Sequence, residues 1–212
     1  MANNTIITIA RQYGSGGHDV GKKLAEELNI PFYDKELLER AAKDSGFCQE
    51  IFENYDEKPT NSFLYSLVMD TYSMGYSSAA FAEMPLNHKI FLAQFNAIKD
   101  IAKEGPCVIV GRCADYALAD FPNVVNVYLY ADMKDRIARI ARRHDLADAK
   151  AKDMIQKTDK SRASYYNYYT NKKWGEATGY DLCLNTGTLG IDGTIHMIRE
   201  FAAYKERKHE KL

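Results

Sequence analysis

A glycine-rich turn near the N-terminus gives the clearest chemical signal of the sequence. Residues 14–17 read Gly-Ser-Gly-Gly and follow a short apolar, β-branched run at Ile6–Ile9. Apolar residues then recur at helical spacing as far as Leu28. A strand, a glycine turn and a helix in this order bind phosphate, because glycines let the backbone approach the anion and the first N–H groups of the helix point at it. The residues expected to form this phosphate cradle are Gly14, Ser15, Gly16, Gly17, His18 and Asp19.

Three charged residues follow apolar runs that are typical of buried strands. Arg11, Asp34 and Arg112 each stand within two residues of the end of such a run. Because ligands of parallel sheets bind at the carboxyl ends of the strands, we expect the three to converge on one crevice. Asp34 is the best carboxylate available for Mg²⁺, which prefers hard oxygen ligands. The alternative role of Asp34 is to cap the helix predicted at residues 35–43.

The helix predicted at residues 132–143 has a basic outer face, and a second helix is expected at 148–169. The two helices contain an acid and several arginines at helical spacing, which either face a phosphate or form a solvated basic surface. These residues are Arg136, Arg139, Arg142, Arg143, Asp159 and Arg162.

The composition restricts the class of protein. The chain has 212 residues, of which 46% are hydrophobic and 27% charged, so an α/β domain with a substantial core is expected. The net charge of −1 argues against a nucleic-acid-binding protein driven by overall charge. No apolar run approaches the ~18 residues of a membrane span and no signal sequence precedes the first strand, so we expect a cytoplasmic protein without membrane contact. The four cysteines are scattered, which is typical of reduced thiols.

Strands and helices alternate along the chain, which predicts an α/β fold with three layers and a mostly parallel five-stranded sheet. Further strands are expected at residues 124–129 and 180–185, and amphipathic helices at 87–103 and 192–204. In this interpretation the whole chain, 1–212, is a single domain.

Residues 44–87 do not follow a regular pattern, because glycines and prolines interrupt them. A long irregular insertion in a compact domain is usually functional. We interpret this one as a helical flap on the substrate side. Its aromatic part, residues 63–86, fits the contact surface of a homo-oligomer equally well.

Two short motifs lie beside the predicted crevice. Asp34 is followed six residues later by Arg40, which is similar to the acceptor segment D-x-G-x-x-Y-R of nucleoside monophosphate kinases. Gly111-Arg112 is similar to the G-R-D motif of the same enzymes, with Cys113 in place of Asp and Asp115 as a candidate substitute. Together with the first strand and loop, these motifs make the chain resemble the P-loop nucleoside monophosphate kinases, and most closely their cytidylate kinase-like group.

The resemblance implies a P-loop NTPase fold with an arginine-rich lid at about 132–172. It also implies ATP-dependent phosphoryl transfer to a nucleoside monophosphate, cytidylate by default, with ATP and Mg²⁺ as cofactors and a small-molecule acceptor as partner. Arg40 would hold the phosphate of the acceptor; the alternative is a surface arginine beside Glu36 or Glu39. The resemblance assigns Arg112, Arg142, Arg162 and Asp34 to catalysis, Asp34, Arg40 and Arg112 to the acceptor, and Arg136, Arg139, Arg143 and Asp159 to the lid.

The Walker A pattern G-x-x-x-x-G-K-[ST] fits the chain in two registers. The literal one, Gly16–Lys22, starts six residues beyond the strand and has Lys23 where Ser or Thr should hold Mg²⁺. A gapless alignment with the kinases places Arg11 at the first loop glycine and Gly17 at the phosphate-binding lysine. The usual lysine is then missing, and Arg11 or Lys22 is the candidate that replaces its charge.

Two other functions stay open at this point. The missing lysine and the missing Mg²⁺-binding hydroxyl favour a catalytically weak or inactive protein that binds a nucleotide or another anion. Lys35-Glu36, in place of the small pair that follows the acceptor Asp in the kinases, and the divergent residues 44–87 favour a kinase of a non-nucleotide small molecule.

Overall fold

The structure is a computed structural model that describes residues 4–46, 50, 57 and 84–209. Most of the insertion at 44–87, and with it the predicted helical flap, lies outside the described residues.

In the described part of the chain, parallel strands form one sheet in the order β2-β3-β1-β4-β5. The strands are β1 (Ile6–Arg11), β2 (Phe32–Tyr33), β3 (Val108–Val110), β4 (Val124–Tyr130) and β5 (Leu182–Asn185). The central strands β1, β3 and β4 are mostly apolar along their whole length, as expected for strands that helices cover on both faces. The predicted fold class is confirmed, with a sheet that is entirely parallel.

The register of the sheet brings the charged residues at the strand ends to one edge. Ile9 of β1 pairs with Val110 of β3, and β2 runs parallel to β3 on its other side. Arg11, Asp34 and Arg112 therefore stand at the ends of three neighbouring strands, at the same carboxyl-terminal edge of the sheet.

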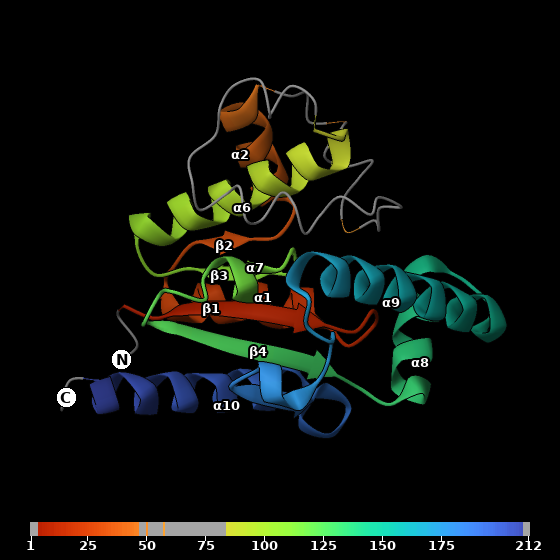
Figure 1. The fold of residues 1–212 in the computed structure, drawn as a ribbon. Helices are drawn as coiled ribbons and strands as arrows, with labels where there is room; N and C mark the ends of the chain where they lie inside the picture. Colours follow the sequence, from red (N-terminus) through yellow and green to blue (C-terminus); the bar gives the residue numbers. More distant parts are fainter. Residues whose placement is uncertain (1–3, 47–49, 51–56, 58–83, 210–212) are drawn as a thin grey trace.

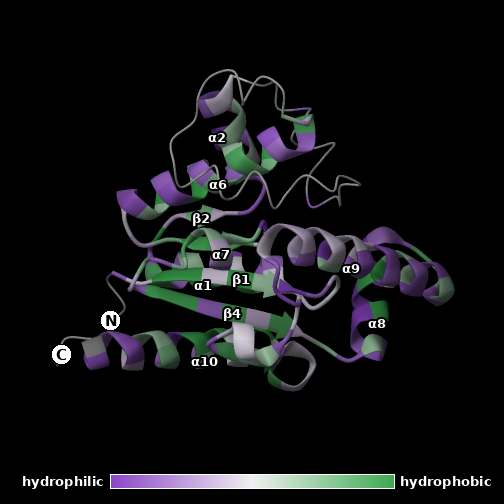
Figure 2. Cartoon of the chain, in the orientation of Figure 1, coloured by the Kyte–Doolittle hydropathy of each residue, from purple (hydrophilic) through white to green (hydrophobic). Residues whose placement is uncertain are grey.

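Helices cover both faces of the sheet (Figure 1). α1 and α10 pack on one face through buried side chains such as Val20, Leu24 and Ile198. α6 and α7 pack on the other face, and α2 packs against α6. Apolar residues, green in Figure 2, gather on the strands and on the helix faces next to them.

None of the helices in the residues that the structure describes is long and apolar enough to span a membrane. The helices are α1 (Gly17–Leu28), α2 (Glu36–Ser45), α6 (Leu86–Glu104), α7 (Ala114–Ala117), α8 (Met133–His144), α9 (Asp148–Thr170), the short 3-10 helix η1 (Ala177–Gly179) and α10 (Thr186–His209).

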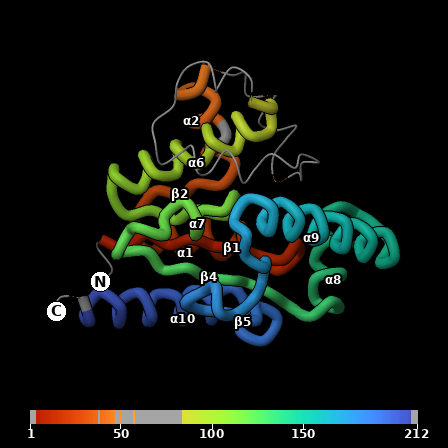
Figure 3. The backbone as a smooth tube through the Cα atoms, viewed as in Figure 1, coloured from red at the N-terminus to blue at the C-terminus, as the bar shows by residue number. Residues whose placement is uncertain are grey.

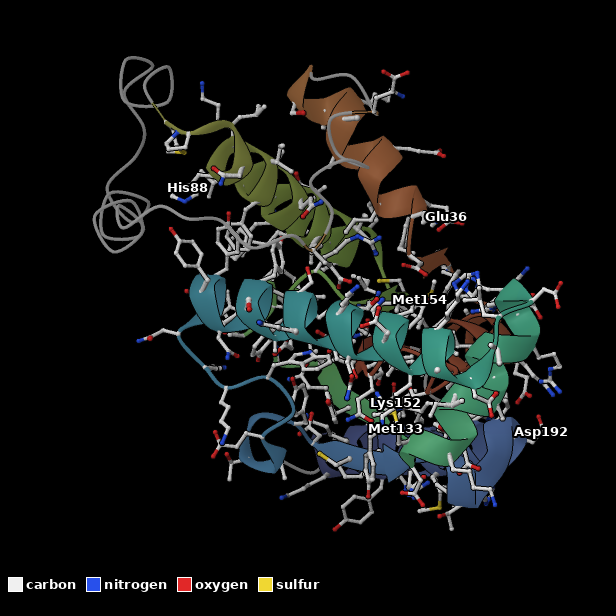
Figure 4. The ribbon with its side chains drawn as sticks, turned by 90° about the vertical axis from the view of Figure 1, so that its right-hand side faces the viewer. Glu36, His88, Met133, Lys152, Met154 and Asp192 are labelled. Carbon is white, nitrogen blue, oxygen red and sulfur yellow. The ribbon has the colours of Figure 1, made fainter. Side chains whose placement is uncertain are left out.

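α8 and α9 stand beyond the carboxyl ends of the strands (Figures 1 and 3). Figure 4 looks onto these two helices and shows α9 crossing in front of the sheet. They pack on each other through Ile140 and Ile155. Tyr169 of α9 stacks on Phe91 of α6, with the ring centroids 3.9 Å apart. The two helices are thus fixed over the edge at which the charged residues lie.

α10 starts before the helix that the sequence predicts at 192–204. The side-chain oxygen of Asn185 accepts hydrogen bonds from the backbone N–H groups of Gly187 and Thr188, at 2.9 and 3.4 Å. This cap satisfies the first N–H groups of an additional turn. Gly190, with a φ of +67°, bends the chain between that turn and the remainder of the helix.

Candidate active site

The loop between β1 and α1 is a tight glycine turn at the start of a helix. β1 ends at Arg11 and α1 begins at Gly17, so the loop lies between them. Gly14 and Gly16 have φ angles of +81° and +84°, a left-handed conformation that glycine adopts without strain. The literal Walker register would need a loop that extends to Lys22, but that residue is already inside α1. The gapless register is the one that matches the structure.

Side chains of other elements bind two carbonyl groups of this turn. The Gly14 carbonyl accepts a hydrogen bond from Nη1 of Arg139 at 2.6 Å, and the Ser15 carbonyl accepts one from Oγ1 of Thr186 at 2.6 Å. In a trans peptide the N–H points opposite to the C=O, so the N–H of Gly16 faces away from Thr186. The first N–H groups of a helix also have no acceptor within it. The turn therefore directs backbone N–H groups to the side on which an anion can bind.

An open hollow lies in front of the loop. About half of the residues singled out from the sequence line it, and the sequence did not single out Gln12, Tyr13, Lys35 and His144, which line it as well. The loop residue Ser15 is buried and does not line the hollow. The lining residues are Arg11, Gln12, Tyr13, Gly14, Gly16, Gly17, His18, Asp34, Lys35, Arg139, Arg143, His144 and Arg162.

Arg11 occupies the place where the side chain of a loop lysine would start. A Cβ added to Gly17, the lysine position of the gapless register, would lie 2.7 Å from Cβ and 2.8 Å from Cγ of Arg11. A Cβ added to Gly111 would collide with the guanidinium group of Arg11. Arg11 therefore extends from the end of β1, across the start of α1, to the end of β3. Two glycines leave this path open.

Sequence reasoning missed a carboxylate that lies among the arginines. Oε1 of Glu57 accepts hydrogen bonds from Nη1 of Arg11 at 2.6 Å and from the backbone N–H of Arg112 at 3.2 Å. Oε2 accepts one from Nε of Arg162 at 2.9 Å. Burial opposes the ionisation of Glu57, but the charges of the arginines outweigh it and lower the pKa of this carboxyl. No local pattern marks Glu57, because Arg11 is 46 positions away in the sequence.

Asp34 and Arg112 form a buried ion pair. Oδ1 of Asp34 lies 2.8 Å from Nη1 of Arg112, a residue that is 3% exposed. The other oxygen of Asp34 lies 2.7 Å from Nδ1 of His18. Burial opposes the ionisation of Asp34, but the charges of Arg112 and Arg11 outweigh it and lower its pKa. Asp34 is therefore ionised at neutral pH and is held between the β3 turn and the start of α1.

The expected role of Asp34 as a Mg²⁺ ligand stays a prediction. Its two oxygens face Arg112 and His18. The residues that the structure describes contain no group of three or more His, Cys, Asp or Glu side chains placed to hold a metal ion. The alternative role, a cap of the next helix, is not formed, because no side chain caps the start of α2.

Asp159 connects α8 and α9 to the loop. Its Oδ1 accepts a hydrogen bond from the backbone N–H of Tyr13 at 2.7 Å, and its Oδ2 pairs with Nη1 of Arg136. The hydroxyl of Tyr13 contacts the sulfur of Met154 at 3.7 Å, a residue that Figure 4 labels on α9. At the margin of the hollow, α8 is also joined to α1 by an exposed ion pair, Arg143–Asp19, at 3.2 Å. These contacts join α8 and α9 to the loop and to the start of α1.

Among the expected site residues that do not line the hollow are three cations that lie on the surface of the molecule. Lys22 is exposed on the outer side of α1, and Arg142 is exposed on α8. Arg40 pairs with Asp44 at 2.9 Å and with Glu104 at 2.7 Å, on the surface between α2 and α6. The structure therefore does not bring these three cations to the glycine loop.

Asp115, two residues beyond the position of the missing G-R-D aspartate, is buried under α9. Its Oδ2 accepts a hydrogen bond from the hydroxyl of Tyr166 at 2.6 Å. Burial raises the pKa of Asp115. The carboxyl is thus part of a buried polar contact with α9.

We expect Asp115→Asn to increase the free energy of unfolding at pH 8 and to change it little at about pH 3. Because the folded pKa lies above the unfolded value of 3.8, the native protein binds this proton more tightly than the unfolded chain. The wild type therefore loses stability as the pH rises through the folded pKa, and the variant does not. Urea unfolding at several pH values measures the difference, and a difference that is the same at every pH would contradict the expectation.

The chain is similar to known proteins over most of its length. The model of the cytidylate kinase-like family matches residues 6–188. The chain belongs to the cytidylate kinase-like family. A cytidylate kinase of Ignicoccus hospitalis is 24% identical over 196 residues, which are 92% of this chain and 97% of that protein. Among solved structures, an uncharacterized protein from Eubacterium ventriosum is 32% identical with a TM-score of 0.71, covering 94% of this chain and 98% of the other.

A shikimate kinase from Bacteroides thetaiotaomicron has a TM-score of 0.52 at 16% identity, covering 93% of this chain and 97% of the other, and shows the fold alone. The resemblance that the sequence indicates is thus confirmed. As a member of the cytidylate kinase-like family, the chain is a P-loop small-molecule kinase-like protein. It differs from the Walker A pattern at the loop lysine, where Gly17 stands beneath Arg11.

Proposed function

We propose that this protein transfers a phosphoryl group from ATP to a small-molecule acceptor, and that a nucleoside monophosphate is the first acceptor to test. Cytidylate is the default choice, because the family and the Ignicoccus hospitalis relative carry its name. The proposal rests on the position of Arg11, which lies across Gly17 in front of the glycine loop. A cation at this place is what phosphoryl transfer needs and what the altered Walker A motif otherwise lacks.

Phosphoryl transfer depends on positioning and on neutralisation of phosphate oxygens. In the proposed reaction the backbone N–H groups at the start of α1 hold the phosphates of ATP. Arg11 and Arg162 neutralise the group in transfer, and Arg139 and Arg143 add positive charge from the lid. Asp34 compensates the charge of its buried partner and orients it. Mg²⁺ arrives with ATP in this proposal, and none of the described side chains is assigned to it.

Release of ADP from ATP in a coupled assay, with a panel of nucleoside monophosphates, tests the proposal. Acceptor-dependent release of ADP would support it. ATP with Mg²⁺ should also raise the Tm, because a ligand that binds only the folded state stabilises that state. A purified protein that neither releases ADP with any acceptor nor gains thermal stability from ATP with Mg²⁺ would contradict it.

A non-nucleotide acceptor is the second candidate, and the position of Arg40 favours it. By resemblance Arg40 would bind the phosphate of a monophosphate acceptor. Its guanidinium instead contacts Asp44 and Glu104, away from the hollow. Small hydroxylated molecules in the same ADP-release assay distinguish this candidate from the first.

We expect Arg40→Ala to change the KM of the preferred acceptor by less than about threefold, because exposed ion pairs contribute little and the side chain lies outside the hollow. Steady-state kinetics measures the change. Arg199→Ala is the matched control, since Arg199 also forms an exposed pair with a glutamate, Glu27, at 2.9 Å. A tenfold higher KM for cytidylate in Arg40→Ala alone would instead support binding of an acceptor phosphate by Arg40.

A further inference from the structure

Three arginines meet around one carboxylate at the carboxyl ends of β1 and β3. Arg11 and Arg112 are 9% and 3% exposed, and the side chain of Arg162 is 15% exposed. Glu57 accepts hydrogen bonds from Nη1 of Arg11, from Nε of Arg162 and from the backbone N–H of Arg112. The side chain of Glu57 is itself only 13% exposed. An anionic group is therefore bound here by donors from three separate parts of the chain.

The charges around Glu57 do not balance. The guanidinium of Arg112 pairs with Asp34 at 2.8 Å, so its charge is already compensated. Arg11 and Arg162 share the single negative charge of Glu57. Burial, and next to it the charge of Arg11, lowers the pKa of Arg162, which indicates that the two guanidinium groups repel each other. A group with two negative charges would compensate both arginines.

The backbone of the turn after β3, at Gly111–Cys113, also contacts the carboxylate of Glu57. Gly111, Arg112 and Cys113 have consecutive φ angles of +78°, +54° and +56°. Left-handed residues in a turn present neighbouring N–H groups to one side and form an anion-binding concavity. The N–H of Arg112 is the donor that contacts Glu57, at 3.2 Å.

The carboxylate of Glu57 lies close to the hollow in front of the glycine loop. Arg11 and Arg162, its two ion-pair partners, also line the hollow in front of the glycine turn. Glu57 and the same two arginines line a second, smaller pocket that extends toward Asp115. Glu57 thus lies beside the loop hollow and shares two arginines with it.

We propose that Glu57 occupies the subsite of a substrate phosphate group, and that this phosphate displaces the carboxylate from Arg11, Arg162 and the N–H of Arg112. A phosphate group carries about −1.5 to −2 charges at neutral pH and three acceptor oxygens, which match the two guanidinium groups and the N–H. That the phosphate belongs to a substrate of phosphoryl transfer rests on the proposed function. It comes either from the terminal phosphate of the nucleotide donor or from a monophosphate acceptor. Glu57 keeps the two arginines together while the subsite is empty, and it competes with the incoming phosphate.

Glu57→Gln tests the proposal, because it removes the charge and keeps the shape of the side chain. We expect the Kd to fall by about tenfold for the ligand whose phosphate enters the subsite, since no charge-assisted contact then competes with it. Isothermal titration calorimetry with a non-hydrolysable ATP analogue and, separately, with cytidine monophosphate identifies which phosphate gains. The matched control is Glu27→Gln, which removes the carboxylate of the exposed pair with Arg199 and should leave both Kd values unchanged.

Unchanged or weaker binding of both ligands by folded Glu57→Gln protein would overturn the proposal, because Glu57 would then be a permanent partner of the arginines. Circular dichroism establishes that the variant is folded. If it is not, Glu57→Asp keeps the charge but is too short to maintain all three contacts, and the same decrease in Kd is expected. Tighter binding without any release of ADP would contradict the proposed function alone. Turnover of ATP with no gain in affinity would contradict this inference alone.

Discussion

Arg11→Gly should lower kcat/KM for ATP by about 100-fold, and Arg11→Gly combined with Gly17→Lys should recover a large part of this loss. A charge-assisted hydrogen bond to a phosphate contributes about 1.5–3 kcal/mol, and each 1.36 kcal/mol changes a rate tenfold. Arg11 is the cation that lies across the start of α1. In the gapless register the double variant carries a glycine at the first loop position and a lysine at the phosphate position, as in the Walker A pattern.

The single variant Gly17→Lys provides the control for this exchange. A Cβ at position 17 would lie 2.7 Å from Cβ of Arg11, so the two side chains cannot both occupy the space. We expect Gly17→Lys alone to be destabilised by about 1–3 kcal/mol, as is typical of overpacked sites. Coupled ADP-release kinetics and urea unfolding of all three variants measure the two effects. A double variant that is no more active than Arg11→Gly would contradict the exchange of roles.

Asp34→Ala should reduce the free energy of unfolding by about 3–5 kcal/mol, which is the usual cost of leaving one partner of a buried ion pair alone. Arg112 is 3% exposed, and its Nη1 lies 2.8 Å from Asp34. The double variant Asp34→Ala/Arg112→Met removes both charges and should cost much less than the sum of the two single changes. Urea unfolding of the four proteins measures this coupling, and simple additivity would contradict it.

We expect the stability that this ion pair contributes to depend on pH. The folded pKa of Asp34 lies below its unfolded value of 3.8, because the arginine charges outweigh the effect of burial. The stability that the ionised carboxylate contributes is therefore present above pH 3.8 and is lost as the pH falls through the folded pKa. The difference between the wild type and Asp34→Ala should decrease in acid. A difference that stays constant from neutral pH to about pH 2 would argue against an ionic origin.

The convergence of charges at the sheet edge could be predicted from the sequence. Arg11, Asp34 and Arg112 each follow an apolar run, and the carboxyl ends of neighbouring parallel strands meet at one edge whatever the side chains between them. The observed register has this consequence. The glycine turn and the family could also be predicted from the sequence, because both depend on short continuous motifs.

The orientation of helical side chains was less predictable. Arg40 was placed near the acceptor by a motif, but Leu37 and Ala41 turn the apolar face of α2 toward the core. With that face directed inward, Arg40 lies beside Glu104 of α6. The literal Walker register predicts that Lys22 binds phosphate, but Lys22 lies on the outer side of α1 because the helix starts at Gly17. In both cases the packing of the helix, which no local motif encodes, decides the direction of the side chain.

The sequence by itself determined the parallel sheet, the glycine turn and the charged residues at the strand ends, because each of these follows from a short local pattern of residue types. Only the tertiary structure decided which charges are paired. Glu57 reaches Arg11, Arg162 and the N–H of Arg112 from 46 or more positions away. Asp34 is bound by Arg112 from 78 positions away. The strength of such pairs depends on distance and burial, which exist only once the chain has folded.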